Sequence, residues 1–465
     1  MPSETTTTRP GRTRSQPWRL PVAILSVACG VRLLCFSLAL TTPGAFREPD
    51  SAEYHRLALQ LLHRGRFRQG NQPEIFRPPG YPLFAAVVYA VSGPRPGAVV
   101  LVQLAADAGV CLLLLFGTCR LTGRADDDAR QEGTAAAAWH AVALVSVVFA
   151  CKLLSDSLFA LLLLLLLLML RAPRAAAGPA PAVRAAGHGF AAGLLGGIMI
   201  LWRAIAGPYI ALTVALTLLQ RRWMRALGLV AGCLLVITPW MVRNAVAAGY
   251  PGLSTVGAIN LYRYNTAALR AHVRGTSFAS EQNRIDRELA AADSPAARAR
   301  LARRQAVPEL LRHPLAYAWI HLRSSAASLL PAAGDLMRLA GIRVGGRGTL
   351  GVLQDHGPAA AVRHYFGGRP AAAAASVPAV LLLALKYLAA LWGTWTLWRS
   401  GRRWECAWLV LAVGYFLLVP GPASHPRFRV PVEPVLALLA GVGAAALARP
   451  KREIGSSRQL FGSSR

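Results

Sequence analysis

Leucine fills most positions from residue 158 to residue 170, and no other feature constrains the fold of this chain as strongly. A helix formed by this run would be apolar around its whole circumference and would have no face to turn toward water. Such a helix must be surrounded by lipid or by other protein. Because 54% of the 465 residues are hydrophobic and only 15% are charged, we expect an all-α polytopic membrane protein rather than a soluble domain.

About ten segments have the length and composition of a membrane-spanning helix, which needs roughly 20 apolar residues. The first is longer than the apolar core of a signal peptide, so we interpret it as a retained span. The apolar segment Tyr81 to Val91 is too short to span, and we expect it to lie at the membrane interface or to re-enter. The predicted spans are residues 18–40, 98–117, 134–151, 154–170, 188–202, 205–219, 224–241, 376–398, 404–420 and 430–448.

The charges of the short connections predict the orientation. If Tyr81 to Val91 lies at the interface, the basic connections fall on one side of the membrane together with the N-terminus. The positive-inside rule places that side in the cytoplasm, so both termini are expected there, with the chain in the cell (plasma or inner) membrane. These connections are residues 120–130, 171–184, 221–225, 399–403 and 449–452.

This topology divides the chain into five parts. The two polar ends are expected to be disordered cytoplasmic tails. Between them lie an N-terminal membrane module with a first outer loop, a second and larger extracytoplasmic loop with interfacial helices, and the last transmembrane helices. In chain order the parts are residues 1–17, 18–241 (with the outer loop 41–97), 242–375, 376–448 and 449–465.

The net charge of +30 invites a nucleic-acid function, but the pattern of the basic residues argues against one. They lie between apolar segments and do not line one helical face or an arm. Contact with anionic lipid head groups and with a phosphate-bearing substrate fits better. The seven cysteines show no CxxC or zinc-ligand spacing, so we expect no metal site and no cofactor.

Under the predicted topology, unusual polar residues of the helix ends gather on the extracytoplasmic side. Charge near the hydrocarbon is costly, about 2.5–3.5 kcal/mol for one Arg or Asp at a helix centre, so such clusters usually have a task. The alternative for any one arginine is ordinary anchoring at the interface. The residues are Asp50, Glu53, Arg77, Asp156, Arg203, Arg243, Asn260, Tyr262, His425, Arg427 and Arg429.

Three local motifs strengthen the functional interpretation. REPDSAEYHRLALQLL (47–62) places acidic residues ahead of a helix, where Asp50 is either catalytic or an N-cap that forms a capping box with Glu53. FRPPGYPLF (76–84) is a stiff turn that could hold Arg77 toward a phosphate. SHPRFRVPVEP (424–434) brings a histidine and two arginines to the start of the last span, and arginine suits phosphate because its planar fork makes paired hydrogen bonds.

Together these motifs resemble the GT-C superfamily of membrane glycosyltransferases, and within it the bacterial protein-mannosyltransferase-like family (glycosyltransferase family 39, ArnT-like). In that family an acidic residue of the first outer loop precedes a tyrosine-bearing helix and an R-x-PGYP-like turn. The matching residues, in chain order, are Asp50, Tyr54, Arg77 to Pro82, Ser155 with Asp156, Pro239 to Asn244, Ser254 to Tyr262, and His425 to Pro431.

The chain differs from the family in its first motif. A lone Asp50 has Glu48 and Glu53 nearby, where the family has an adjacent acidic pair. This difference leaves open which carboxylate is the base and whether a divalent cation takes part.

The resemblance implies a GT-C fold and transfer of a single sugar, mannose or similar, from a polyprenyl-phosphate donor to an acceptor hydroxyl, with inversion. It implies Asp50 as the general base. Arg77, Arg203, Arg243, His425, Arg427 and Arg429 would bind the donor phosphate. Glu53, Tyr54, Tyr81, Asp156, Asn260 and Tyr262 would bind substrate. The acceptor, whether protein, glycan, lipid or peptide natural product, is not identified by the sequence.

Two other functions fit parts of the same pattern. A transporter or flippase of a lipid-linked or anionic substrate would also carry intramembrane arginines, although transporters usually place their sites near the bilayer midplane and show internal repeats. A ligase that moves a whole glycan from a lipid diphosphate would use similar arginines and a similar base.

Overall fold

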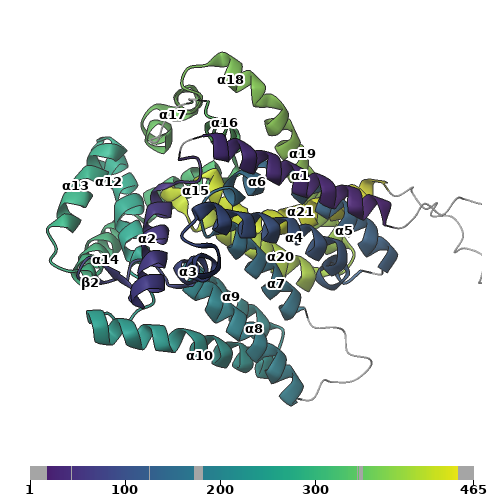
Figure 1. The fold of residues 1–465 in the computed structure, drawn as a ribbon, viewed down its shortest axis with the longest axis horizontal. Helices are drawn as coiled ribbons and strands as arrows, with labels where there is room; N and C mark the ends of the chain where they lie inside the picture. Colours follow the sequence, from purple (N-terminus) through teal and green to yellow (C-terminus); the bar gives the residue numbers. More distant parts are fainter. Residues whose placement is uncertain are drawn as a thin grey trace, which may run out of the picture.

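The computed structural model describes residues 18–42, 44–124, 126–171, 182–342, 344 and 349–448. The predicted tails 1–17 and 449–465 and most of the connection 171–184 lie outside these residues. The described chain is almost entirely helical, which confirms the all-α prediction (Figure 1). Its two strands, β1 (Arg68–Gln69) and β2 (Gln72–Pro73), form a short antiparallel hairpin.

Six described helices are long and apolar enough to cross a membrane, so the chain is a multi-pass membrane protein. The pair α5 (Asp126–Ala141) and α6 (Leu144–Ala150), bent by 54°, would make a seventh span. The six are α1 (Arg19–Thr41), α4 (Pro96–Thr122), α8 (Ala182–Trp202), α10 (Trp223–Ala248), α18 with α19 (Pro370–Ala375 and Val377–Arg399), and η4 with α21 (Pro426–Val432 and Glu433–Ala448).

The remaining three predicted spans are helical but short. They correspond to α7 (Asp156–Leu170), α9 (Ala206–Leu219) and α20 (Arg403–Leu418). The 15 residues of α7 extend about 22 Å at 1.5 Å per residue, less than the roughly 30 Å of a hydrocarbon core. Helix length alone therefore supports six or seven spans rather than ten. The 13 residues of α3 (Gly80–Ser92) are too few for a span, as predicted.

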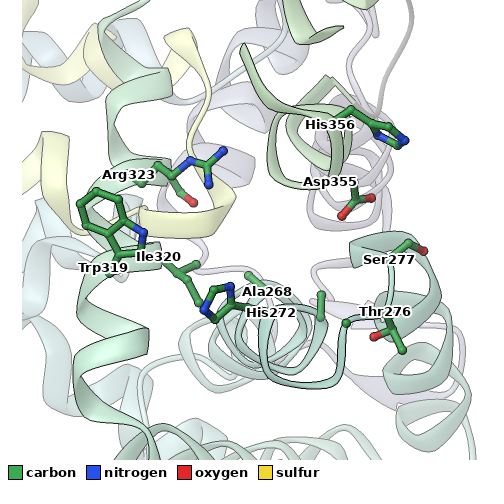
Figure 2. Close-up of a pocket in the computed structure, with 12 residues that line it drawn as sticks. Ala268, His272, Thr276, Ser277, Trp319, Ile320, Arg323, Asp355 and His356 are labelled. Atoms are coloured by element: carbon green, nitrogen blue, oxygen red, sulfur yellow. The ribbon is translucent and has the colours of Figure 1, made fainter. Parts of the chain in front are cut away.

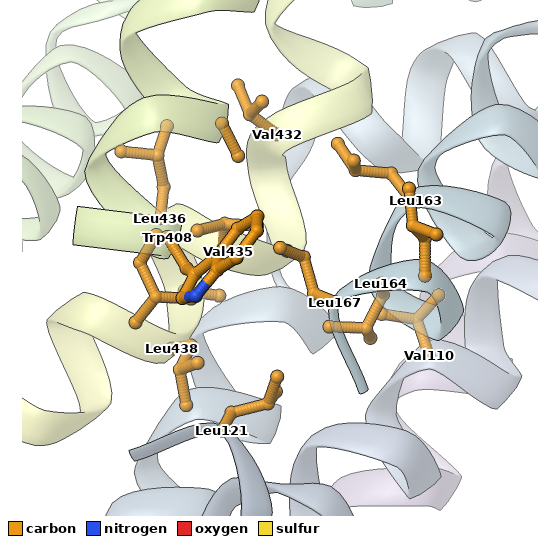
Figure 3. Packing of buried hydrophobic residues seen from close by; sticks show 14 of the residues in the cluster. Val110, Leu121, Leu163, Leu164, Leu167, Trp408, Val432, Val435, Leu436 and Leu438 are labelled. Atoms are coloured by element: carbon orange, nitrogen blue, oxygen red, sulfur yellow. The ribbon is translucent and has the colours of Figure 1, made fainter. Parts of the chain in front are cut away.

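The leucine run of α7 is covered by protein. Leu163, Leu164 and Leu167 are buried in the main core, where they meet side chains of α4, α20 and α21 such as Val110 and Trp408 (Figure 3). An all-round apolar helix is therefore the natural centre of this bundle, and it holds the first residue of α7 in a fixed place.

Glycines let two pairs of helices approach backbone to backbone. In the α8–α10 pair, a Cβ added at Gly232 would lie 2.2 Å from the carbonyl oxygen of Phe190. In the α19–α21 pair, a Cβ added at Gly393 would lie 1.9 Å from the carbonyl oxygen of Leu439. Small residues at such contacts are typical of helix packing in membranes.

Gly232→Ala is expected to destabilise the protein by about 1–3 kcal/mol, the usual cost of overpacking, although alanine is the better helix former by about 1 kcal/mol. Unfolding in detergent measures the effect. Gly30→Ala in α1 is the matched control, because nothing lies within 4 Å of a Cβ added there. Equal stabilities of the two variants would contradict the close approach.

The basic connections meet at one end of the bundle. Nε of Arg120 donates to the carbonyl oxygen of Arg171 at 2.6 Å, and Nη2 of Arg171 lies 2.6 Å from Oε1 of Glu405. Nη1 of Arg225 donates to the carbonyl oxygen of Leu170 at 2.9 Å. Because α7 runs from Asp156 to Leu170, its first residue lies at the opposite end. This grouping agrees with the predicted topology, and the compartment each end faces stays a prediction.

The segments predicted to lie outside form further helices. The first outer loop contains α2 (Pro49–Arg64). The second contains α11 (Val256–Asn260), the π-helix η1 (Leu261–Thr266), α12 (Ala267–Arg274), α13 (Phe278–Ala290), α14 (Pro295–Arg312), α15 (Pro314–Ser325), η2 (Ala326–Leu329), α16 (Ala333–Leu339) and α17 (Thr349–Tyr365). A turn of 3-10 helix, η3 (Gly421–Ala423), precedes η4. Helices α12, α13 and α14 form a group with its own apolar core (Figure 1).

Candidate active site

A chain of ion pairs lies at the end of the bundle where α7 begins, and Asp50 is at its centre. Oδ1 of Asp50 accepts a hydrogen bond from Nη2 of Arg77 at 2.7 Å. Oδ2 accepts one from Nη1 of Arg427 at 2.8 Å. Each oxygen of this carboxylate is therefore bound by a different arginine.

Both arginines are held by a second carboxylate. Nε of Arg77 donates to Oε2 of Glu53 at 2.6 Å, and Nε of Arg427 donates to Oδ2 of Asp156 at 2.8 Å. Asp156 also pairs with Arg203, which is the last residue of the ion-pair chain. Three acids alternate with three arginines, so their formal charges cancel. Asp156 is fully buried, whereas the Glu53 end is 36% exposed.

Residues far apart in the sequence build this chain. Asp50 and Glu53 come from the first turns of α2, and Arg77 comes from the turn before α3. The other three come from the beginning of α7, the residue after α8, and η4. The structure thus brings together six of the predicted site residues from all three motifs and from two further helix ends.

The N-terminus of α2 is capped by Glu48, so the alternative interpretation of Asp50 as the N-cap is wrong. Glu48 and Ser51 form a reciprocal capping box, in which the Glu48 amide donates to Oγ of Ser51 at 2.9 Å. Oγ of Ser51 donates in turn to the carbonyl oxygen of Leu153 at 2.9 Å, and Glu48 pairs with Lys152. These contacts fix α2 beside the start of α7 and leave the Asp50 carboxylate to the arginines.

Burial and the arginines act in opposite directions on the pKa of Asp50. Burial is the largest single influence and favours the neutral acid, but Arg427 and Arg77 together outweigh it and hold the pKa of Asp50 well below its usual value. The carboxylate is therefore ionised at neutral pH, as a base must be before it accepts a proton.

The turn that carries Arg77 is fixed by the buried side chain of Glu74. Oε1 of Glu74 accepts hydrogen bonds from the amides of Phe76 at 2.6 Å and Arg77 at 3.0 Å. Nη1 of Arg243 donates to the Glu74 carbonyl oxygen at 2.7 Å, and Oγ of Ser254 donates to the Phe76 carbonyl oxygen at 2.5 Å. The segments around Arg243 and Ser254 therefore hold the turn from the second outer loop.

Glu74→Ala is expected to lower the activity of the site about 100-fold, because a misplacement of about 1 Å can cost that much. Glu74→Gln should keep most of the activity, because the glutamine amide oxygen can accept the same two hydrogen bonds. Burial also raises the pKa of Glu74, which favours its uncharged form, and glutamine is uncharged as well. The turnover of the two variants measures the difference. Equal losses would show that the negative charge of Glu74 matters rather than its position.

Two buried tyrosines line the inner side of the Arg77 turn. The Arg77 guanidinium lies 5.2 Å from the centroid of the Tyr54 ring, and the Tyr54 and Tyr81 rings meet edge to face at 4.6 Å. The Tyr81 hydroxyl donates to Oε1 of Gln103 at 2.5 Å, and the Tyr54 hydroxyl lies 3.5 Å from Oγ of Ser155. Both predicted substrate-binding tyrosines are therefore close to the ion pairs, and Tyr81 is anchored to α4.

Three predicted phosphate-binding residues do not belong to the chain of ion pairs. Nδ1 of His425 accepts a hydrogen bond from the Arg427 amide at 3.2 Å, so the His425 side chain caps η4 and lies next to the ion-pair chain. Arg243 donates to backbone carbonyl oxygens of the first outer loop. Arg429 is buried and donates to Glu433 at 3.0 Å and to the Tyr387 hydroxyl at 2.8 Å.

Asn260 and Tyr262 lie in the second outer loop. The Tyr262 ring is fully buried in the α12–α14 group, where its hydroxyl bonds to Glu288 and lies 3.2 Å from Nη1 of Arg270. The Asn260 carbonyl oxygen accepts a hydrogen bond from Asn265 at 3.5 Å. These contacts all lie within the second outer loop.

Sequence reasoning missed two groups of charged residues inside the predicted spans. Arg32 of α1 lies 2.6 Å from Asp107 of α4, which also lies 3.4 Å from His140 of α5, and all three are buried. Lys386 of α19 pairs with Glu433 of α21. A charged residue within an apolar run was the signal available, since such residues usually pair with one another.

A cavity of about 470 Å³ lies among the helices of the second outer loop (Figure 2). Its wall includes His272 near the end of α12, Trp319 and Arg323 of α15, and Asp355 and His356 of α17. No residue of the ion-pair chain lines it. Among the described residues, no three His, Cys, Asp or Glu side chains are grouped as metal ligands.

Comparisons with known proteins give no family assignment. No protein-family model and no curated protein matches the chain. Solved structures that match include crystal structures of ArnT from Cupriavidus metallidurans, one bound to undecaprenyl phosphate and one in the apo state. The undecaprenyl-phosphate complex is 14% identical to this chain, and the alignment covers 92% of this chain and 78% of the ArnT chain. The apo structure is 16% identical, with coverages of 92% and 77%. The TM-score is 0.39 in both cases.

Proposed function

We propose that this protein is a membrane glycosyltransferase of the GT-C type, which moves a single sugar from a polyprenyl-phosphate donor to an acceptor hydroxyl on the extracytoplasmic side. The observation that carries the proposal is the Asp50 carboxylate, held ionised between two arginines at one end of a bundle of apolar helices. A base beside fixed positive charge suits the attack of a hydroxyl on a carbon whose leaving group is a phosphate.

In this reaction Asp50 accepts the proton of the acceptor hydroxyl while the acceptor oxygen attacks the anomeric carbon. The bond between that carbon and the phosphate oxygen breaks, and the electron pair leaves with the phosphate. Direct attack inverts the anomeric configuration. One well-placed donor at a developing negative charge lowers a barrier by about 2.7–4 kcal/mol.

We assign the donor phosphate to Arg77, Arg427 and Arg203, the three predicted arginines that belong to the ion-pair chain. Each lies at a helix end or in a turn, within reach of a carrier whose isoprenoid tail stays in the membrane. Arg243 and Arg429 donate mainly to backbone groups and a neighbouring acid, so we assign them to holding the outer segments in place. Mannose or a related hexose or pentose is the sugar we propose.

One observation favours the transporter as a second candidate. In the buried group of Arg32, Asp107 and His140, the first two lie well inside α1 and α4, and His140 lies in the last turn of α5, next to its bend with α6. Transporters bind their substrates near the middle of the membrane. The same group also joins three helices, which is a sufficient structural role. A transporter would depend on Asp107 more than on Asp50.

The test is transfer of radiolabelled sugar from several polyprenyl-phosphate sugars, including the mannose form, by membranes that contain the wild-type protein. Cell extract supplies the acceptors, and membranes without the protein are the control. Labelled product with inverted anomeric configuration is expected, and an arm with chelator tests the need for a divalent cation. Transfer only from a lipid diphosphate would favour the ligase, and no transfer from any carrier would contradict the proposal.

A further inference from the structure

We propose that Asp50 and the leaving phosphate share the same two arginines, Arg77 and Arg427. Once Asp50 has accepted a proton it no longer neutralises them, and their positive charge can then stabilise the phosphate as the sugar leaves. The inference rests on the proposed function and goes beyond it. It makes the base and the phosphate site one electrostatic unit.

The geometry of the two arginines supports this sharing. Arg77 and Arg427 each give one terminal nitrogen to Asp50 and the Nε nitrogen to another acid. Those other acids, Glu53 and Asp156, keep the guanidinium groups in place when the contact to Asp50 weakens. The arginines can therefore turn their charge toward a new anion without leaving the site. Both are only 14% exposed, so water screens them weakly.

The charges of the reaction balance within this unit. The donor phosphodiester carries one negative charge, and the phosphomonoester that leaves carries nearly two at neutral pH. Asp50 begins with one negative charge and ends neutral, because the acceptor proton has moved to its carboxylate. One negative charge thus disappears beside the arginines as another develops on the phosphate.

The pairing of acids and arginines explains why the unit needs this exchange. Three acids neutralise the three arginines before substrate binds, so the site offers little net attraction to a dianion. The unit is neutral while the singly charged donor is bound, and protonation of Asp50 gives it a charge of +1 as the leaving phosphate gains its second negative charge. Interactions that are stronger late in the reaction than in the ground state are those that accelerate it.

The experiment compares the binding of undecaprenyl phosphate with the binding of its singly charged methyl ester to purified protein in detergent. Asp50→Asn represents the protonated base. It is expected to bind the monoester at least about fivefold tighter than wild type does, the lower range of coupling between interacting sites. The methyl ester should gain less. Asp286→Asn is the matched control, because it removes the same charge from an exposed pair with Arg263 and should change neither affinity.

Equal monoester affinities of Asp50→Asn and wild type, weaker binding by the variant, or equal gains for both ligands would overturn the inference. Asp50→Ala decides the question if the asparagine variant does not remain monodisperse, because it also frees both arginines. Binding is measured without turnover. Absence of sugar transfer by wild type would therefore count against the proposed function, whereas the affinity ratios test the sharing of the arginines separately.

Discussion

Asp50→Asn is expected to lower sugar transfer by about 10²–10⁴-fold, the range for loss of a general base. An amide cannot accept the acceptor proton at neutral pH, and no described group takes the place of Asp50 between the two arginines. The protein should still fold, because Arg77 keeps Glu53 and Arg427 keeps Asp156 as partners. Initial rates of transfer from the labelled carrier, together with the melting temperature in detergent, measure both expectations.

Two further variants separate the chemistry at Asp50 from a general loss of charge. Asp50→Glu keeps a base but moves it by about one methylene, so it should retain part of the activity. Asp286→Asn removes a carboxylate from an exposed outer-loop pair and should transfer sugar at the wild-type rate. Turnover of Asp50→Asn within threefold of wild type would remove Asp50 from the mechanism.

The sequence predicted the elements of the site better than it predicted their partners. Asp50, Arg77 and Arg427 stood out because each lies in a short motif at a predicted helix end. Their shared hydrogen bonds depend on how α2, the start of α7 and η4 pack together. The periodicity of the sequence does not predict contacts between such distant segments. The alternative of Asp50 as the cap of α2 was wrong for a related reason. Glu48 and Asp50 both lie near the predicted start of the helix, and only the backbone geometry shows that the helix begins between them, at Pro49.

The partners of two other arginines could not be predicted from the sequence. Most hydrogen-bond acceptors of Arg243 and Arg429 are carbonyl oxygens of distant segments, and phosphate binding by these two residues stays a prediction. Every residue has a backbone carbonyl oxygen, so the sequence does not indicate which one an arginine will contact.

The predicted number of spans differed from the number supported by helix length. Apolar composition predicts burial as well as membrane crossing, and the short helix α7 is apolar because it is buried among other helices.

Arg427→Met is expected to cost about 3–5 kcal/mol of stability, the usual result of breaking a buried ion pair from one side. Methionine keeps much of the volume and removes the charge that faces Asp50 and the fully buried Asp156. Arg263→Met is the matched control, since its pair with Asp286 is about 40% exposed on both sides and such pairs contribute about 0–1 kcal/mol. Denaturation in detergent measures both. A cost below about 1 kcal/mol for Arg427→Met would contradict the role of this ion pair.

The double variant Arg427→Met with Asp156→Asn separates stability from activity. Asp156→Asn removes one negative charge and so restores the neutrality that Arg427→Met takes from the ion-pair chain, but it also removes the carboxylate partner of Arg203. Part of the lost stability should therefore return. Transfer should not return, because the leaving phosphate still lacks a positive charge that is expected to be worth about 10²–10³-fold in turnover. Recovery of transfer together with stability would mean that Arg427 only holds the helices together. Recovery of stability alone would place its charge in the reaction, where the shared contact with Asp50 requires it to be.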